Sequence, residues 1–151
     1  MVFPKIKLKQ MIGNKSDTMK TILITGINGY LGSHLAKKLS SQYKIIGLEY
    51  SLTNLFRIKN CDYIVYQSSN DILESLFQEQ IIDIIIHTAT FYGRNEEDNK
   101  QLFYSNLEFP FRLLEKAIDN KCKIFLNTDT VLDRFVSSYA LTKKQFNDWL
   151  W

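Results

Sequence analysis

The chain has 151 residues, of which 45% are hydrophobic, and this is enough for a single packed domain. Its net charge of +3 comes from dispersed lysines rather than from a basic face interleaved with aromatic residues, which argues against nucleic-acid binding. No apolar run reaches the roughly 18 residues that a membrane-spanning helix needs, and no signal peptide is recognisable. Cys61 and Cys122 fit neither a disulfide framework nor a metal-ligand spacing. We therefore expect a cytoplasmic protein with two free thiols, no metal site and no membrane contact.

Strand-length apolar runs alternate with helical periodicity along most of the chain. Residues 1–18 are lysine-rich and aperiodic, so we expect a loosely ordered N-terminal extension before a Rossmann-like domain over residues 19–151. The apolar runs lack the polar alternation of half-exposed strands, so we expect each to be buried on both faces. They cover residues 20–26, 44–50, 62–67, 82–89 and 122–128. Leucines at positions 31, 35 and 39 indicate a helix after the first run, and residues 72–77 indicate a second. The alternation predicts an α/β fold, a doubly wound parallel sheet of about five strands.

Three glycines follow the first predicted strand, in the string TGINGYLGSH. In a doubly wound domain, the N-terminus of the first helix offers free N–H groups and a positive dipole end to a pyrophosphate. Gly26 would permit the sharp turn, Gly29 would let phosphates approach the backbone, and Gly32 would let the helix pack closely on the strand. The alternative is an ordinary glycine-rich turn, but the position between a strand and a helix favours a dinucleotide site.

The order of motifs resembles that of the extended short-chain dehydrogenase/reductases, in the NAD-dependent epimerase/dehydratase family that acts on nucleotide sugars. TGINGYLGSHL resembles the family's cofactor loop, DIIIHTAT its fourth strand, SNLEFPFRLLEKA its fourth helix, FLNTDTVL its fifth strand and YALTK its Tyr-x-x-x-Lys sequence. The resemblance implies a Rossmann fold, an NAD(P) cofactor and a nucleotide-sugar substrate. It also implies cofactor contacts from Gly26, Asn28, Gly29, Tyr30, Leu31, Gly32, Ala89, Asn106, Tyr139 and Lys143.

Tyr139 and Lys143 are four positions apart, so on a helix they share a face. A free tyrosine has a pKa of ~10, and acid/base work near neutral pH requires lowering it by about 3 units, roughly 4 kcal/mol. A lysine ammonium ~4 Å away supplies on the order of 4 kcal/mol at an effective dielectric constant of about 20. We therefore expect Lys143 to lower the pKa of Tyr139. The alternative is a surface tyrosine beside a solvated lysine.

The resemblance also implies a catalytic hydroxyl at the end of the fifth strand, and the alignment of NTDTVL places Thr128 there. In the family's 4,6-dehydratases this segment reads Thr-Asp-Glu, with both carboxyl groups taking part in the elimination of water. Here the third position is Thr130, which argues against dehydration and leaves 4-epimerisation or reduction of a 4-keto sugar. The string NTDT resembles that of CDP-deoxyhexose reductases of the abequose-synthase kind. For Asp129 a turn-capping role is an equal alternative, and His87 is expected to be structural rather than catalytic.

Glu49 ends the second predicted strand about 20 residues after the glycine loop, where an acidic side chain would accept hydrogen bonds from the adenosine ribose. A carboxylate there repels a 2′-phosphate, so we expect NAD rather than NADP. Arg57 and Lys59 follow closely, and either could reach a phosphate, so NADP stays open as an alternative.

Residues 101–118 carry two apolar stripes, whereas a helix that packs only on its own sheet needs one. The resemblance implies a homodimer through the helices at 101–118 and 138–151. The alternative for the second stripe is packing under another part of the same polypeptide. Pro110 would free the carbonyl of Asn106 from its helical bond and bend the helix.

The family's pattern continues beyond the motifs present here, into a region that grips the nucleotide sugar. We therefore expect an incomplete domain, the N-terminal half of a nucleotide-sugar epimerase or 4-keto-sugar reductase, with no turnover by the isolated chain. The alternative function is a non-catalytic dinucleotide-binding or redox-sensing domain.

Overall fold

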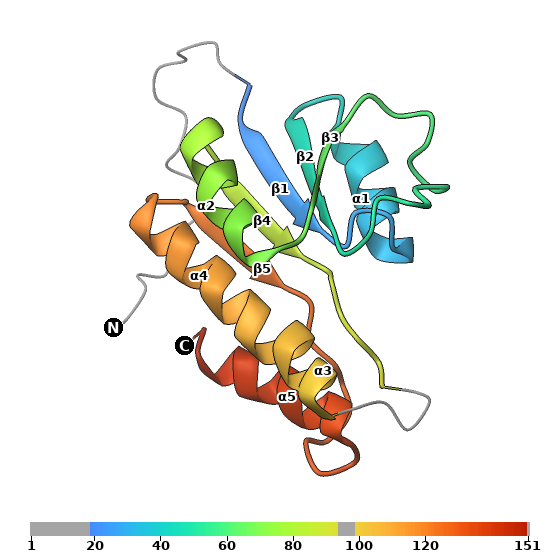
Figure 1. Cartoon of the computed structure of the whole chain (residues 1–151), viewed down its shortest axis with the longest axis vertical. Helices are drawn as coiled ribbons and strands as arrows, with labels where there is room; N and C mark the ends of the chain where they lie inside the picture. Colours follow the sequence, from blue (N-terminus) through green and yellow to red (C-terminus); the bar gives the residue numbers. More distant parts are fainter. Residues whose placement is uncertain (1–18, 94–98, 151) are drawn as a thin grey trace.

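A computed structural model describes residues 19–93 and 99–150, and the predicted N-terminal extension lies outside these ranges. Within them, five parallel strands form one sheet in the order β3-β2-β1-β4-β5 (Figure 1). The strands are β1 (Thr21–Thr25), β2 (Lys44–Glu49), β3 (Ile64–Gln67), β4 (Ile84–His87) and β5 (Ile124–Asn127). The helical segments are α1 (Tyr30–Leu39), α2 (Asn70–Glu79), α3 (Asn99–Phe103), η1 (Tyr104–Glu108), α4 (Phe109–Asp119) and α5 (Ser138–Asp148). The predicted doubly wound fold is confirmed.

β2 and β3 lie on one side of β1 in the sheet, and β4 and β5 lie on the other side, so the strand order reverses at β1 and β4. β1 pairs with β2 on one side, with Thr25 beside Leu48, and with β4 on the other, with Thr25 beside His87. The loops that follow β1 and β4 therefore diverge at the carboxyl edge of the sheet, which is where open α/β sheets bind ligands. The glycine loop follows β1, and Ala89 follows β4.

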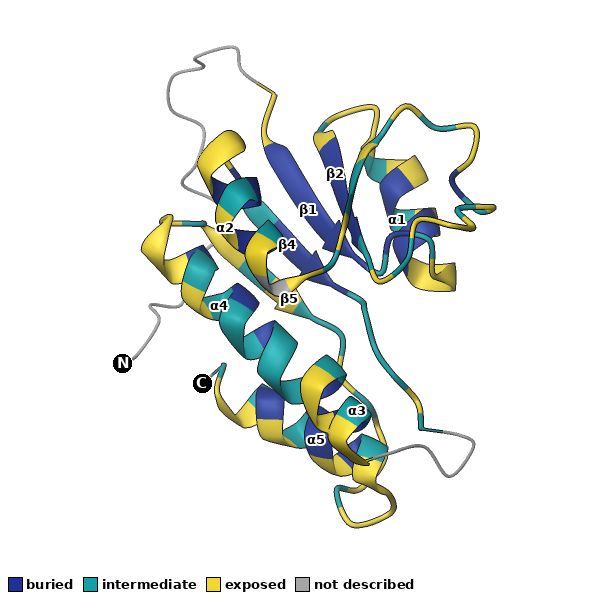
Figure 2. Ribbon diagram, in the orientation of Figure 1, coloured by how far each residue is buried: buried dark blue, intermediate teal, exposed yellow. Residues whose placement is uncertain are grey.

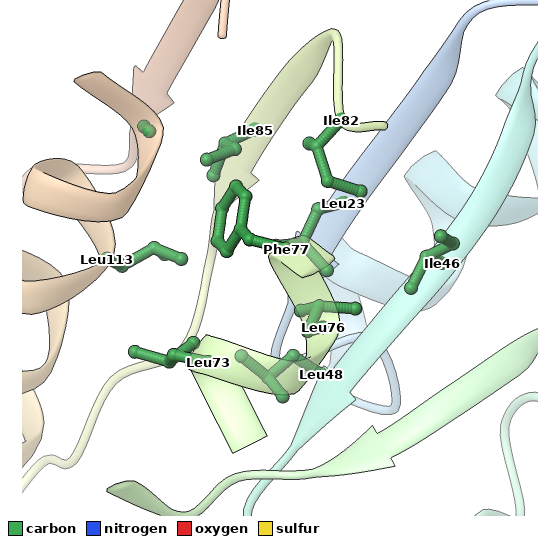
Figure 3. Close-up of a cluster of buried hydrophobic side chains, with 10 residues drawn as sticks. Leu23, Ile46, Leu48, Leu73, Leu76, Phe77, Ile82, Ile85 and Leu113 are labelled. Atoms are coloured by element: carbon green, nitrogen blue, oxygen red, sulfur yellow. The ribbon is translucent and has the colours of Figure 1, made fainter. Parts of the chain in front are cut away.

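Helices cover both faces of the sheet, and each face has its own apolar core. Leu23 of β1 lies with residues of β2, α2, β4 and α4, including Leu48, Leu76 and Leu113 (Figure 3). Ile22 and Ile24, whose side chains point to the opposite face, pack with Ala36 of α1. This alternation along β1 fixes the register of the strand, because a shift by one residue would exchange the two cores.

The prediction that every strand is buried on both faces holds for the centre of the sheet and is wrong for its edges. All five residues of β1 are buried, whereas every described residue of β3 and β5 is exposed or partly exposed (Figure 2). Ile124 and Leu126 are about half exposed. Each edge strand has a neighbour on one side only among the described residues, so its apolar composition does not report full burial.

The helix predicted at 101–118 extends over residues 99–119, and its irregularity takes the form of a π-helical turn. Pro110 has no N–H for the carbonyl of Asn106, and just before it the N–H of Phe109 bonds to the carbonyl of Tyr104, five residues back. The helix predicted at 138–151 begins at Ser138 and ends at Asp148. In the part of the chain that the structure describes, no helix is long and apolar enough to span a membrane.

Candidate functional site

A cleft of about 1110 Å³ opens at the carboxyl edge of the sheet. Its lining comes from the glycine loop, the ends of β2, β4 and β5, the π-helical turn and α5. Ten of the predicted site residues line it: Gly26, Gly29, Tyr30, Leu31, Gly32, Glu49, Ala89, Thr128, Tyr139 and Lys143. Segments more than 100 residues apart in the sequence thus contribute to one site.

The glycine loop has little room for side chains. Gly26 has a φ of +66°, and a Cβ there would lie 2.9 Å from the backbone of Ala89. A Cβ on Gly32 would lie 2.2 Å from the carbonyl oxygen of Gly26. The loop therefore turns sharply and brings the first turn of α1 against β1. The N–H groups of that first turn have no helical acceptor and are free to hold an anion.

Glu49 is partly buried at the end of β2 and holds the glycine loop. Its Oε2 accepts the N–H of Asn28 at 2.9 Å, and its Oε1 accepts the N–H of Tyr50 at 3.2 Å. A carboxylate has about four lone-pair sites, so acceptor capacity remains for ribose hydroxyls. The predicted contact between Glu49 and a ribose is therefore compatible with its observed role in fixing the loop.

Two predicted cofactor residues, Asn28 and Asn106, do not line the cleft. The side chain of Asn106 is buried, where its Oδ1 accepts the N–H of Phe91 at 2.8 Å and its Nδ2 donates to the carbonyl of Phe91 at 2.8 Å. The same amide lies 3.3 Å from the hydroxyl of Thr142. Asn106 therefore connects the π-helical turn to the loop after β4 and also to α5. It helps to position these cleft-lining segments without lining the cleft itself.

Tyr139 and Lys143 reach the cleft from the first half of α5, which begins where the hydroxyl of Ser137 accepts the N–H of Ala140. Lys143 is only 3% exposed, and burial lowers the pKa of its ammonium group. The charge of Asp129 opposes this lowering, but among the described residues Asp129 forms its ion pair with Lys144 and not with Lys143. A buried ammonium group at a cleft is suited to ligand oxygens.

The expectation that Lys143 lowers the pKa of Tyr139 is not met in this structure. The pKa of Tyr139 is raised, first by burial and next by the neighbouring Tyr92, while hydrogen bonds to Thr90 and Thr130 oppose the rise. The Tyr139 ring stacks on Tyr92, with centroids 5.1 Å apart. Sequence reasoning missed Thr90 and Tyr92, and their position just after Ala89, in the loop that follows β4, was the available signal.

The hydroxyl of Thr128 donates to the carbonyl of His87 at 3.0 Å and lines the cleft. Because its hydrogen is used, the oxygen of Thr128 is placed to accept a hydrogen bond from a ligand. His87 itself is 1% exposed and bonds to the hydroxyl of Thr25, which supports its structural role.

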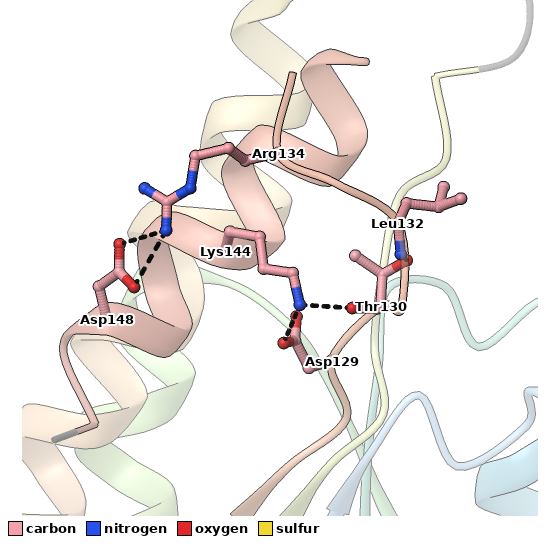
Figure 4. A network of polar contacts seen from close by, with 6 residues as sticks. All are labelled: Asp129, Thr130, Leu132, Arg134, Lys144 and Asp148. Carbon is pink, nitrogen blue, oxygen red and sulfur yellow. Dashed lines mark hydrogen bonds and ion pairs between the residues drawn. The ribbon is translucent and has the colours of Figure 1, made fainter. Parts of the chain in front are cut away.

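Asp129 forms an ion pair rather than a turn cap. Its Oδ2 lies 2.7 Å from Nζ of Lys144, which also donates to the carbonyl of Thr130 (Figure 4). Asp129 lines the cleft, whereas Lys144 does not. This ion pair connects the segment after β5 to α5, and it gives the carboxylate of Asp129 a cationic partner within the protein. The described residues hold no cluster of three or more His, Cys, Asp or Glu side chains that could bind a metal.

Known proteins share both the sequence pattern and the fold. The chain is 31% identical over 137 residues to a CDP-abequose synthase from Salmonella muenchen, a match covering 86% of this chain and 46% of that protein. It is 30% identical to a dTDP-D-glucose 4,6-dehydratase from Dictyostelium discoideum, with 80% of this chain and 32% of that protein covered. The chain thus spans about half the length, or less, of these curated relatives.

Among solved structures, the Bordetella bronchiseptica enzyme WbmH in complex with NAD⁺ matches with a TM-score of 0.77 and 24% identity, covering 88% of this chain and 52% of that one. The UDP-glucose 4-epimerase from Thermotoga maritima matches with a TM-score of 0.76 and 22% identity, covering 86% and 50%. The sequence profile of the NAD dependent epimerase/dehydratase family matches residues 22–143. The chain belongs to the NAD dependent epimerase/dehydratase family.

Proposed function

We propose that the cleft binds NAD(H) and that the chain supplies the cofactor-binding and acid/base part of a nucleotide-sugar epimerase or 4-keto-sugar reductase. One observation carries the proposal: the glycine loop and the Tyr139–Lys143 pair, which lie far apart in the sequence, line the same cleft. The NAD⁺ complex of the structurally similar WbmH supports this choice of cofactor.

The residues of the cleft fit a dinucleotide. The first turn of α1 would hold the pyrophosphate, since side chains are excluded at Gly26 and Gly32 and the helix N-terminus favours an anion. Glu49, which lines the cleft at the end of β2, would accept the adenosine ribose hydroxyls, which favours NAD(H) over NADP(H). Lys143 would donate to oxygens of the other ribose.

When bound, NAD⁺ supplies a hydride acceptor and NADH a hydride donor. The chain's own groups would handle the proton that moves with the hydride. Tyr139 would exchange a proton with a sugar oxygen, and the Thr128 hydroxyl, which lines the cleft, would orient that oxygen by donating its hydrogen to it in place of the carbonyl of His87. Because burial raises the pKa of Tyr139, its hydroxyl keeps its proton near neutral pH, and this protonated form is the one that the reduction of a 4-keto sugar requires.

The residues after β5 support hydride chemistry over dehydration. Thr130 offers no carboxylate base, and Asp129 is already paired with Lys144. Together with the similarity to CDP-abequose synthase, this favours a reductase or epimerase. A chimera tests the choice: residues 22–143 would replace the corresponding segment of that synthase. We expect CDP-abequose formation that Tyr139→Phe lowers by at least about 100-fold. A chimera that folds and forms no CDP-abequose would contradict the proposal.

Cofactor binding is tested directly by calorimetric titration of the purified chain with NADH. We expect Lys143→Met to weaken binding by about tenfold, since it removes a charged donor from the cleft. The matched control is Lys38→Met, an exposed lysine in the last turn of α1, which should leave the affinity unchanged. Failure of the wild-type chain to bind NADH with a dissociation constant below about 1 mM would refute the proposed function.

A second candidate is a non-catalytic dinucleotide-binding domain, favoured by the raised pKa of Tyr139 and its stacking on Tyr92. Under this alternative the chain binds NADH as tightly as expected, but the folded chimera forms no CDP-abequose. The chimera experiment therefore separates the two functions.

A further inference from the structure

Asn28 lies at the centre of a hydrogen-bond cluster that joins three segments of the chain. Its backbone N–H donates to Glu49, at the end of β2. Its side-chain Nδ2 donates to the carbonyl of Asn54 at 2.9 Å, and its Oδ1 accepts the N–H of Arg57 at 3.0 Å. Its backbone carbonyl accepts a fourth bond from Nη1 of Arg57 at 3.3 Å. Asn28 thus links the glycine loop both to β2 and to the segment between β2 and β3.

That segment, residues 50–63, contains no helix or strand. Turn hydrogen bonds and the buried side chain of Ile58 attach its second half to the core, and the contacts made by Asn28 hold Asn54 and Arg57 beside the glycine loop. The residues it places matter for a ligand, because Arg57 lines the cleft together with Glu49 and the glycine loop, while Asn28 does not.

Glu49 and Arg57 both line the cleft and both bond to Asn28, so they bring opposite charges to one part of the cleft. Within the part of the chain that the structure describes, the two side chains form no ion pair with each other. Arg57 donates one of its five side-chain N–H groups to the carbonyl of Asn28. The guanidinium group also lies 4.3 Å from the centre of the Phe56 ring. Its remaining donors are therefore available to an anion, and a guanidinium group matches the geometry of a phosphate.

We propose that Asn28 is a positioning residue that sets the choice between NAD(H) and NADP(H) by holding Arg57 beside Glu49. The inference rests on the proposed binding of a dinucleotide in this cleft. Glu49 alone would repel a 2′-phosphate strongly, and Arg57, held in place by Asn28, offsets part of that repulsion. The cleft therefore prefers NAD(H) but accepts NADP(H) with a modest penalty. Asn28 acts on this preference through Arg57, without touching the ligand.

The test is calorimetric titration of NADH and NADPH into the full chain and four variants. Arg57→Ala should weaken NADPH binding about tenfold more than NADH binding, because it removes a charged partner of the 2′-phosphate. Asn28→Ala should produce the same selective loss. The double variant should lose no more selectivity than Arg57→Ala, since both changes remove one interaction. Asn54→Ala is the matched control: it keeps the backbone carbonyl that Asn28 contacts, so both affinities should stay unchanged.

A loss of equal size for NADH and NADPH in Asn28→Ala, or additive losses of selectivity in the double variant, would overturn the inference while leaving the proposed function intact. Binding of neither dinucleotide by the wild-type chain would instead refute the proposed function, and the inference with it. Should Asn28→Ala fail to fold by circular dichroism, Asn28→Ser gives the same comparison, because its side chain is too short to bridge Asn54 and Arg57.

Discussion

Mild acid is predicted to destabilise the fold through His87. The imidazole is 1% exposed, bonds to the Thr25 hydroxyl at 2.7 Å, and is surrounded by the rings of Phe109, Phe125 and Phe146. Burial, together with the nearby charge of Lys143, lowers the pKa of His87 from 6.5 to about 3. The native protein therefore keeps this imidazole neutral at pH values where the unfolded chain protonates it.

The sign follows from proton uptake. Below pH 6.5 the unfolded state binds a proton that the native state does not, so the free energy of unfolding falls as the pH falls. From pH 7.5 to 4.5, one such group removes about 2.7 kcal/mol of stability, because the native imidazole stays neutral throughout this range. This is a large part of the roughly 5–15 kcal/mol typical of a domain.

Urea unfolding at pH 7.5, 6.0 and 4.5 measures the effect by linear extrapolation. We expect His87→Gln, which keeps a polar side chain near Thr25 but cannot titrate, to lose about 2.7 kcal/mol less than wild type over this range, whatever its stability at pH 7.5. His34→Gln is the control, because His34 is exposed and is the other histidine of the chain. Carboxyl groups titrate in all three proteins and cancel in the comparison. Equal pH dependence in wild type and His87→Gln, within about 0.5 kcal/mol, would refute the reasoning.

Three further predictions concern the cleft and the helices. NADH binding should weaken as the pH rises through the lowered pKa of Lys143, below its ordinary value of 10.5, and calorimetry on Lys143→Met should show no such dependence. Gly32→Ala should cost about 1–3 kcal/mol in urea unfolding and abolish measurable NADH binding, since the added Cβ would press on the carbonyl of Gly26; wild-type affinity in this variant would contradict our account of the loop. We also predict a homodimer, of twice 17.7 kDa by light scattering, through the face that bears Phe103 and Ile118, which are about half exposed. Phe103→Glu should then yield monomers, and a monomeric wild type at every concentration would exclude this interface.

The fold was largely predictable from the sequence because its signals are local and repeated. Five apolar runs, each followed by a turn or a helical pattern, determine a parallel sheet with crossovers, and the glycine loop marks the first crossover. The burial of β3 and β5 was not predictable, because an edge strand and a central strand can have the same composition. What distinguishes them is the number of neighbours, which is a property of the whole sheet.

The electrostatics of the site was the least predictable part. The sequence places Tyr139 and Lys143 four residues apart on α5, and a pairwise estimate from that spacing predicts a lowered tyrosine pKa. The structure adds Tyr92, whose ring stacks on Tyr139, and a degree of burial that raises the pKa instead. Tyr92 belongs to the loop after β4, and neither this neighbour nor the burial of Tyr139 can be read from the spacing of Tyr139 and Lys143.

Asn28 and Asn106 show why a motif can identify a site without identifying its ligand contacts. Both residues are predicted to bind the cofactor, and in this structure both use their amide groups on backbone or side-chain partners within the protein. An amide carries a donor and an acceptor on one rigid group, so it can fasten two segments that have no regular secondary structure in common.

Asn106 fastens the loop after β4 to the π-helical turn, and Asn28 fastens the segment after β2 to the glycine loop. Each loop carries residues that line the cleft, including Tyr92 in one case and Arg57 in the other. Substitution of either asparagine should therefore alter binding through the loop that it holds, and the ratio of affinities for two ligands that differ at that loop is the measurement that separates such a role from direct contact.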